Sequence, residues 1–139
     1  MTTKIRRCLY VGLGGTGMTA LLNTKKTFLE TYGEIPPMIG FLGIDTDGGA
    51  YKKDLDSKYG KVFLTPNEQL PIIVDDARPI YDVSKQHFNW IPEENIYALT
   101  SMNLGAGQVR TNGRFALTVN YRQVESKIKT IIDTITQAQ

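Results

Sequence analysis

A short apolar run that breaks into closely spaced glycines constrains the fold of this chain more than any other feature. Residues 8–11 (CLYV) are apolar, and residues 12–17 read GLGGTG. From residue 16 to about residue 32 the apolar side chains recur on one face of a helix. Because a continuous apolar run is typical of a strand buried on both faces, these segments predict a strand, a glycine turn and a helix in succession.

A second apolar run, residues 38–44, ends at Asp45 and follows the first helix after a pair of prolines. Residues 48–58 are predicted to hold a short helix, and residues 62–64 a third strand. A strand, a helix and a strand in this order imply parallel pairing through a right-handed crossover. The expected fold class is therefore α/β, a three-layer Rossmann-like parallel sheet with flanking helices.

The second half of the chain is less regular where it begins. Residues 66–98 hold four of the six prolines, the only tryptophan and the only histidine. We expect this segment to be an irregular insertion of loops, with a short strand at 72–74. A glycine turn at 103–108 is followed by predicted helices at about 109–118 and 121–137, the last with a clear apolar stripe.

Composition excludes several classes of protein. Lysine and arginine total 16 against 14 acidic residues, and the net charge of +2 does not favour a nucleic-acid partner. No apolar run approaches the roughly 20 residues of a membrane span, and the single cysteine, Cys8, excludes an internal disulfide. We therefore expect a cytoplasmic protein. Because no strand follows the last helix, residues 1–139 are expected to be the truncated N-terminal portion of a larger domain.

The GLGGTG turn is suited to binding a phosphate. Its glycines let backbone N–H groups approach a ligand closely, and the start of the following helix carries partial positive charge. A P-loop would place a lysine after the last glycine, whereas Met18 follows Gly17 here, so an ordinary P-loop is disfavoured. The G-x-G-x-x-G pattern of a dinucleotide-binding fold stays open, with Asp45 placed to bind a ribose. Glycines that serve only a tight turn are the structural alternative.

Two further loops are expected at the same edge of the sheet. Asp45 and Asp47 follow the second strand, where they would bind Mg²⁺ through water or a ribose hydroxyl, or instead cap the next helix and shape the turn. A third loop, residues 105–108 (GAGQ), again runs into a helix and suits a nucleotide tail held from two sides. His87 has no second metal ligand at a suitable spacing. No serine or cysteine pairs with it in a pattern that predicts a catalytic nucleophile.

Together these loops resemble the nucleotide site of the tubulin/FtsZ superfamily, especially its divergent bacterial tubulin-like branch. Residues 9–17 (LYVGLGGTG) are similar to the first phosphate loop of that family, and residues 41–47 (FLGIDTD) are similar to the second. Residues 104–107 (LGAG), followed by Gly113 and Arg114, are similar to the third loop. The last match is the most specific, because the glycine and the basic residue recur at the family's distance into the helix.

The resemblance implies that residues 1–139 are the first part of a domain whose cofactors are GTP or GDP and Mg²⁺, and that this part alone binds GTP weakly or not at all. The residues it assigns to the nucleotide are Gly12, Gly14, Gly15, Thr16, Gly17, Asp45, Asp47, Gly105, Ala106, Gly107 and Gln108. Of these, Asp45 and Asp47 are the candidate Mg²⁺ ligands, through water.

The same resemblance implies that the full-length protein hydrolyses GTP and assembles into cytoskeletal protofilaments. The fragment itself is expected to be catalytically inactive and to dimerise or aggregate through its open strand edge. Two alternatives are kept. One is the NAD(P)- or FAD-binding half of an oxidoreductase, which accounts for the first loop and Asp45 but leaves the third loop unexplained. The other is a scaffold that has kept the fold and lost the nucleotide.

Overall fold

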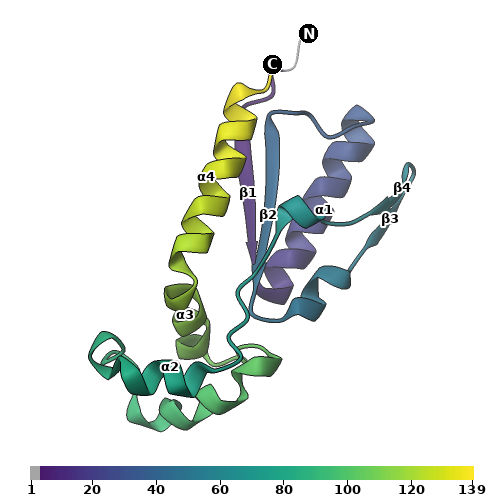
Figure 1. The fold of residues 1–139 in the computed structure, drawn as a ribbon. Coiled ribbons are helices and arrows are strands. Elements are labelled where there is room, and N and C mark those ends of the chain that lie inside the picture. Colours follow the sequence, from purple (N-terminus) through teal and green to yellow (C-terminus); the bar gives the residue numbers. More distant parts are fainter. Residues whose placement is uncertain (1–3) are drawn as a thin grey trace.

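The computed structural model describes residues 4–139, without the side chains of residues 100, 101, 103 and 104. Two long helices cover opposite faces of a three-stranded parallel sheet in the order β1-β2-β5, which confirms the predicted α/β class (Figure 1). The elements of these layers are β1 (Cys8–Leu13), α1 (Gly14–Tyr32), β2 (Ile39–Asp45), β5 (Gln69–Pro71) and α4 (Tyr121–Gln137).

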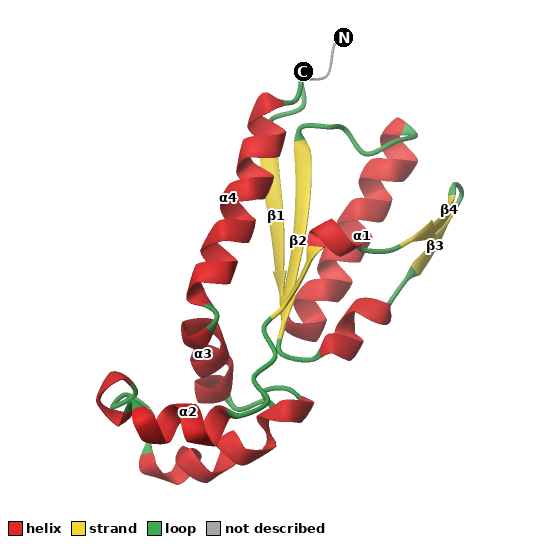
Figure 2. Ribbon diagram, viewed as in Figure 1, coloured by secondary structure: helices red, strands yellow, loops and turns green. Residues whose placement is uncertain are grey.

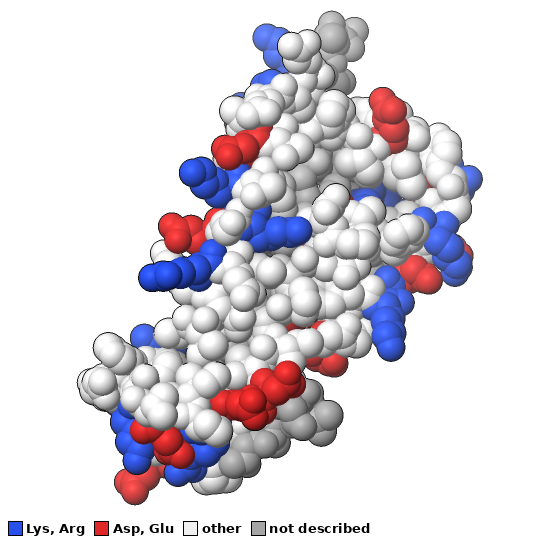
Figure 3. Space-filling model, viewed as in Figure 1, with Lys and Arg blue, Asp and Glu red and all other residues white. Residues whose placement is uncertain are grey.

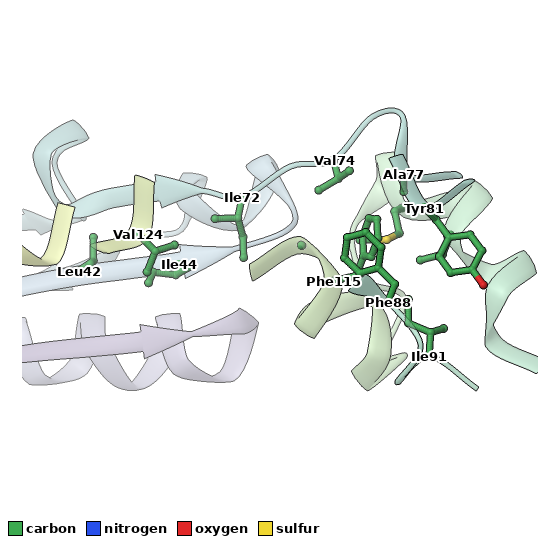
Figure 4. Packing of buried hydrophobic residues seen from close by; sticks show 13 residues of the cluster. Leu42, Ile44, Ile72, Val74, Ala77, Tyr81, Phe88, Ile91, Phe115 and Val124 are labelled. Atoms are coloured by element: carbon green, nitrogen blue, oxygen red, sulfur yellow. The ribbon is translucent and has the colours of Figure 1, made fainter. Parts of the chain in front are cut away.

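The central strand β2 separates two hydrophobic clusters, because its successive side chains point to opposite faces of the sheet. On one face Phe41 packs against Met18 and Leu22 of α1. On the other face Leu42 belongs to the same cluster as Val124 of α4, and Figure 4 shows these two side chains close together. All but the last residue of β2 are buried, as its continuous apolar sequence predicts.

The third parallel strand lies elsewhere than predicted. Residues 60–62 do form a strand, β4 (Gly60–Val62), but it pairs antiparallel with β3 (Leu55–Ser57) in a separate hairpin. Gly60 has a φ of 103° at the hairpin turn, a conformation that favours glycine. Val62 in the hairpin and Leu64 just after it are both buried on the side of α1. Neither residue belongs to a strand of the parallel sheet. The predicted helix at 48–58 is shortened to a 3-10 helix, Gly48–Lys52, before this hairpin.

The parallel partner of β2 is β5, which lies inside the segment expected to be irregular. Residues 69–71 align with residues 43–45, and the backbone N–H of Ile72 also donates to the Asp45 carbonyl at 2.9 Å. The predicted strand at 72–74 therefore begins three residues too late. Ile72 and Val74 are buried in the α4-side cluster, which explains their alternating pattern without a ladder partner.

The rest of the 66–98 segment adds a helical lobe beyond the sheet's carboxyl end (Figure 2). It contains α2 (Ala77–Val83) and short 3-10 turns, and a longer 3-10 stretch, Glu93–Leu104, packs beside α2. The Phe88 and Phe115 rings are 4.7 Å apart between centroids, so the lobe shares the α4-side cluster (Figure 4). The segment thus extends the core of the sheet domain.

The two predicted C-terminal helices are present as α3 (Arg110–Val119) and α4. None of the described helices is both long enough and apolar enough to cross a membrane. Figure 3 shows acidic and basic side chains interspersed over this face of the molecule. Helix α1 begins at Gly14, two residues earlier than predicted, and ends at Tyr32. Gly33, with a φ of 78°, caps the helix by donating its N–H to the Leu29 carbonyl.

Candidate functional site

A cavity of about 560 Å³ opens at the carboxyl end of the parallel sheet. Its lining comes from three separated loops and one lysine: residues 14–15, residues 45–47, residues 49–50, Lys53 and residues 105–108. The glycine turn after β1 and the GAGQ loop before α3 therefore lie on the same cavity, as the sequence predicts. Parallel sheets bind their ligands at this end, where the loops that follow the strands meet.

The glycines of the GLGGTG turn divide into two groups. A Cβ atom added to Gly12 would stand 2.5 Å from the carbonyl oxygen of Gly17, and one added to Gly17 would stand 2.9 Å from the carbonyl carbon of Gly12. These two glycines let the end of β1 touch the first turn of α1, and neither lines the cavity. Thr16, also predicted to bind the nucleotide, is exposed and lies outside the cavity lining.

Gly14 and Gly15 do line the cavity, at the first turn of α1. Gly14 has a φ of 71°, and a Cβ added to Gly15 would have only the Lys53 Nζ nearby, at 3.7 Å. Helix α1 is preceded by Leu13, whose side chain cannot cap it, and its first turn carries no acidic residue. The first N–H groups of a helix have no partner within the helix, and together they favour an anion. The first turn of α1 thus presents these donors at the cavity.

The second loop uses its carboxylates to shape its own turn. The Oδ1 atom of Asp45 accepts a hydrogen bond from the Asp47 N–H at 3.0 Å, and Oδ1 of Asp47 accepts one from the Gly49 N–H at 2.8 Å. Asp47 thereby caps the 3-10 helix, so the structural alternative for these residues is realised. Within the described part of the chain, the Oδ2 atoms carry no hydrogen bond, and both residues line the cavity.

A hydrogen bond ties the second loop to the third. The Oγ1 atom of Thr46, whose side chain is buried, accepts from the Ala106 N–H at 2.9 Å. Gly105, with a φ of 100°, packs against this loop, where an added Cβ would stand 3.4 Å from Cβ of Asp47. Gly107 and Gln108 follow with φ values of 58° and 63°, two consecutive left-handed residues. Backbone in this region is strained for a non-glycine residue, and such strain clusters at ligand sites.

Tyr51 holds the second loop in place, a role that the sequence did not predict. Its hydroxyl oxygen accepts a hydrogen bond from the Asp45 N–H at 2.8 Å, and the hydroxyl donates to the Gly43 carbonyl at 3.3 Å. Partial burial raises the pKa of Tyr51 to about 12, and the nearby Asp45 carboxylate also raises it, while the Asp45 N–H bond lowers it. The only sequence signal is one aromatic side chain in an otherwise small or charged run, GGAYKK.

The raised pKa of Tyr51 predicts a loss of stability at alkaline pH. The unfolded chain ionises this tyrosine near its ordinary pKa of 10.0, whereas the folded protein retains the proton until about pH 12. Its contribution is therefore complete below pH 10.0 and is lost as the pH rises to about 12. We expect the stability advantage over Tyr51→Phe to narrow across this interval. Urea unfolding of both proteins from neutral pH to about pH 12 measures it, and a constant difference would contradict the assignment.

A second cavity of about 540 Å³ adjoins the first and shares Gly14, Asp45, Thr46 and Ala106 with it. It continues along α3, where Arg110 and Arg114 are among its lining residues. The Arg114 guanidinium lies 4.1 Å from the centroid of the Trp90 ring, so this exposed arginine stacks on the helical lobe.

Comparisons with known proteins gave one family match. A family model described as tubulin-like matches residues 9–139, which is nearly the whole chain. Searches of curated proteins and of solved structures gave no match.

Proposed function

Because the chain belongs to the tubulin-like family, we propose that the cavity at residues 14–15, 45–47 and 105–108 binds the phosphate tail of GTP or GDP together with Mg²⁺. The observation that carries the proposal is the convergence of two backbone turns and a pair of carboxylates on one cavity. A dinucleotide site needs only the first turn and one acid, so the third loop favours a nucleotide with a longer phosphate tail.

In this proposal, backbone groups from two loops bind the phosphates. Backbone N–H groups at Gly14 and Gly15 donate to phosphate oxygens, assisted by the positive end of α1. The GAGQ turn at 105–108 lines the same cavity. Gly12 and Gly17 hold the end of β1 against α1, and neither they nor Thr16 line the cavity. The proposed set of binding residues is therefore smaller than the set implied by the sequence.

The pair Asp45 and Asp47 fits a bound Mg²⁺. Mg²⁺ keeps several waters and takes one or two carboxylates plus substrate phosphates, so two acids suffice as protein ligands. Each carboxylate is oriented by a backbone N–H through Oδ1, and its Oδ2 has no other hydrogen bond within the described residues. When bound, the ion neutralises charge between the carboxylates and the phosphates, which would otherwise repel each other. In the full-length protein we propose GTP hydrolysis and assembly into protofilaments.

Parallel calorimetric titrations of the protein with GTP and with NADH, both with Mg²⁺ present, test this function. We expect heat from GTP binding, and we expect the affinity for GTP to fall when Mg²⁺ is removed. Without the ion, the negative charges of the two carboxylates would repel the phosphates. The NADH titration should give little or no heat. Tighter binding of NADH than of GTP would favour the dinucleotide alternative. If neither ligand gave heat of binding, a scaffold without nucleotide would be favoured.

A further inference from the structure

The sequence lacks the lysine of a P-loop, but the fold brings another lysine to the first turn of α1. Lys53 follows the 3-10 helix Gly48–Lys52 and lines the cavity at residues 14–15 and 105–108. Its Nζ atom lies 3.7 Å from the point where a Cβ on Gly15 would stand, at the first turn of α1. The ammonium group is therefore beside the helix N–H groups that face the cavity.

Lys53 is uncommitted within the described part of the chain. It forms no hydrogen bond or ion pair there, whereas its sequence neighbour Asp54 is paired with Lys61 at 3.4 Å. Lys61 also binds Asp56 at 2.8 Å, so the acids of the hairpin are occupied. Lys53 is also the one cationic side chain among the described residues that line this cavity.

We propose that Lys53 binds the phosphate tail of the nucleotide from the α1 side, in place of the missing P-loop lysine. This inference rests on the proposed function. Asp45 and Asp47 lie on the same cavity, so the ligand would meet carboxylates with Mg²⁺ on one side and the ammonium on the other. A lysine acts as a flexible point charge on phosphate, which matches an exposed side chain with no fixed partner.

The test compares Lys53→Met with Lys52→Met, an adjacent exposed lysine that does not line the cavity. Binding of GTP and of inorganic tripolyphosphate, each with Mg²⁺, is measured by calorimetry at two salt concentrations. We expect Lys53→Met to weaken both ligands by about tenfold to a hundredfold, the loss of one hydrogen bond from a charged group. Its affinities should also depend less on salt. Lys52→Met should stay within about twofold of the parent protein, and Lys53→Arg should retain part of the affinity.

The two ligands separate this inference from the proposed function. If the parent protein binds tripolyphosphate and Lys53→Met loses that binding, Lys53 is a phosphate ligand even where GTP shows no preference over NADH. If GTP and tripolyphosphate bind equally well to the parent protein and to Lys53→Met, the lysine inference is wrong while the nucleotide function stands. A parent protein that binds neither ligand would overturn both.

Discussion

Replacement of Gly15 by valine is expected to weaken GTP binding at least about a hundredfold while the protein remains folded. Gly15 lies in the first turn of α1 on the cavity wall, and an added Cβ meets only the mobile end of Lys53. The fold therefore accepts a side chain at this position. The branched valine would fill the space through which a phosphate reaches the backbone N–H groups, and hydrogen bonds to charged groups are worth about 1.5–3 kcal/mol each. Two lost bonds account for the expected effect.

Ala20→Val is the matched control for this substitution. Ala20 is exposed on the same helix and does not line the cavity, so it introduces the same side chain without obstructing a ligand. Calorimetric titration with GTP measures affinity, and circular dichroism with thermal melting measures folding. Gly15→Ala should fall between valine and the parent protein. Undiminished GTP affinity in a folded Gly15→Val protein would mean that the phosphates bind at another loop.

The elements that the sequence predicted well are those whose signals are local. β1 and β2 are continuous apolar runs ended by glycine or acid, and α1 and α4 carry an apolar face over many turns. Such patterns are local, which is why their bounds differ from the structure by only a few residues. The predicted burial of β1 on both faces is wrong, because its side chains are only partly buried and Val11 is exposed. The meeting of the first and second loops was predictable from topology, since loops that follow parallel strands share one edge of the sheet. The third loop follows the 3-10 stretch Glu93–Leu104, so its place on the same cavity was indicated only by its glycine pattern.

The third strand was not predictable because its signal is tertiary. β5 has only three residues, QLP, and it pairs with β2 where Asp45 aligns with Pro71. Nothing in that tripeptide resembles a buried strand. The more apolar stretch at 62–64 looked like one, but its buried side chains pack a hairpin toward α1. An apolar pattern indicates that side chains are buried, but it does not indicate which element of the fold buries them.

The sequence predicted that these loops meet, but it did not predict which of their residues line the cavity. The glycine pattern cannot distinguish a glycine that faces a ligand from one that faces another backbone, because both need the absence of Cβ. Gly14 and Gly15 line the cavity, whereas Gly12 and Gly17 face each other's backbone. The place of Lys53 on the cavity wall was not predicted, because a lysine in a charged run normally indicates a solvated surface. Its position depends on where the 3-10 helix before it ends.

The packing role of Gly12 predicts a second large effect, on stability instead of binding. In Gly12→Ala the new Cβ would stand 2.5 Å from the Gly17 carbonyl oxygen and 2.8 Å from its carbonyl carbon. Both are backbone atoms at the start of α1, so relief requires the helix to move away from the end of β1. Overpacking a core costs about 1–3 kcal/mol and sometimes more. We expect a loss of about 3 kcal/mol in the free energy of unfolding, measured by urea denaturation.

The matched change Gly113→Ala separates this clash from the ordinary effect of adding a methyl group. Gly113 lies inside α3, and among the described residues an added Cβ would have no heavy atom within 4 Å beyond its chain neighbours and its own helix backbone. Alanine is favoured over glycine in a helix by about 0.5–1 kcal/mol, so this variant should be as stable as the parent protein or slightly more stable. If Gly12→Ala unfolded at the same urea concentration as the parent protein, the contact between β1 and the first turn of α1 would not be the tight one described. Gly12 would then be free to serve a ligand instead.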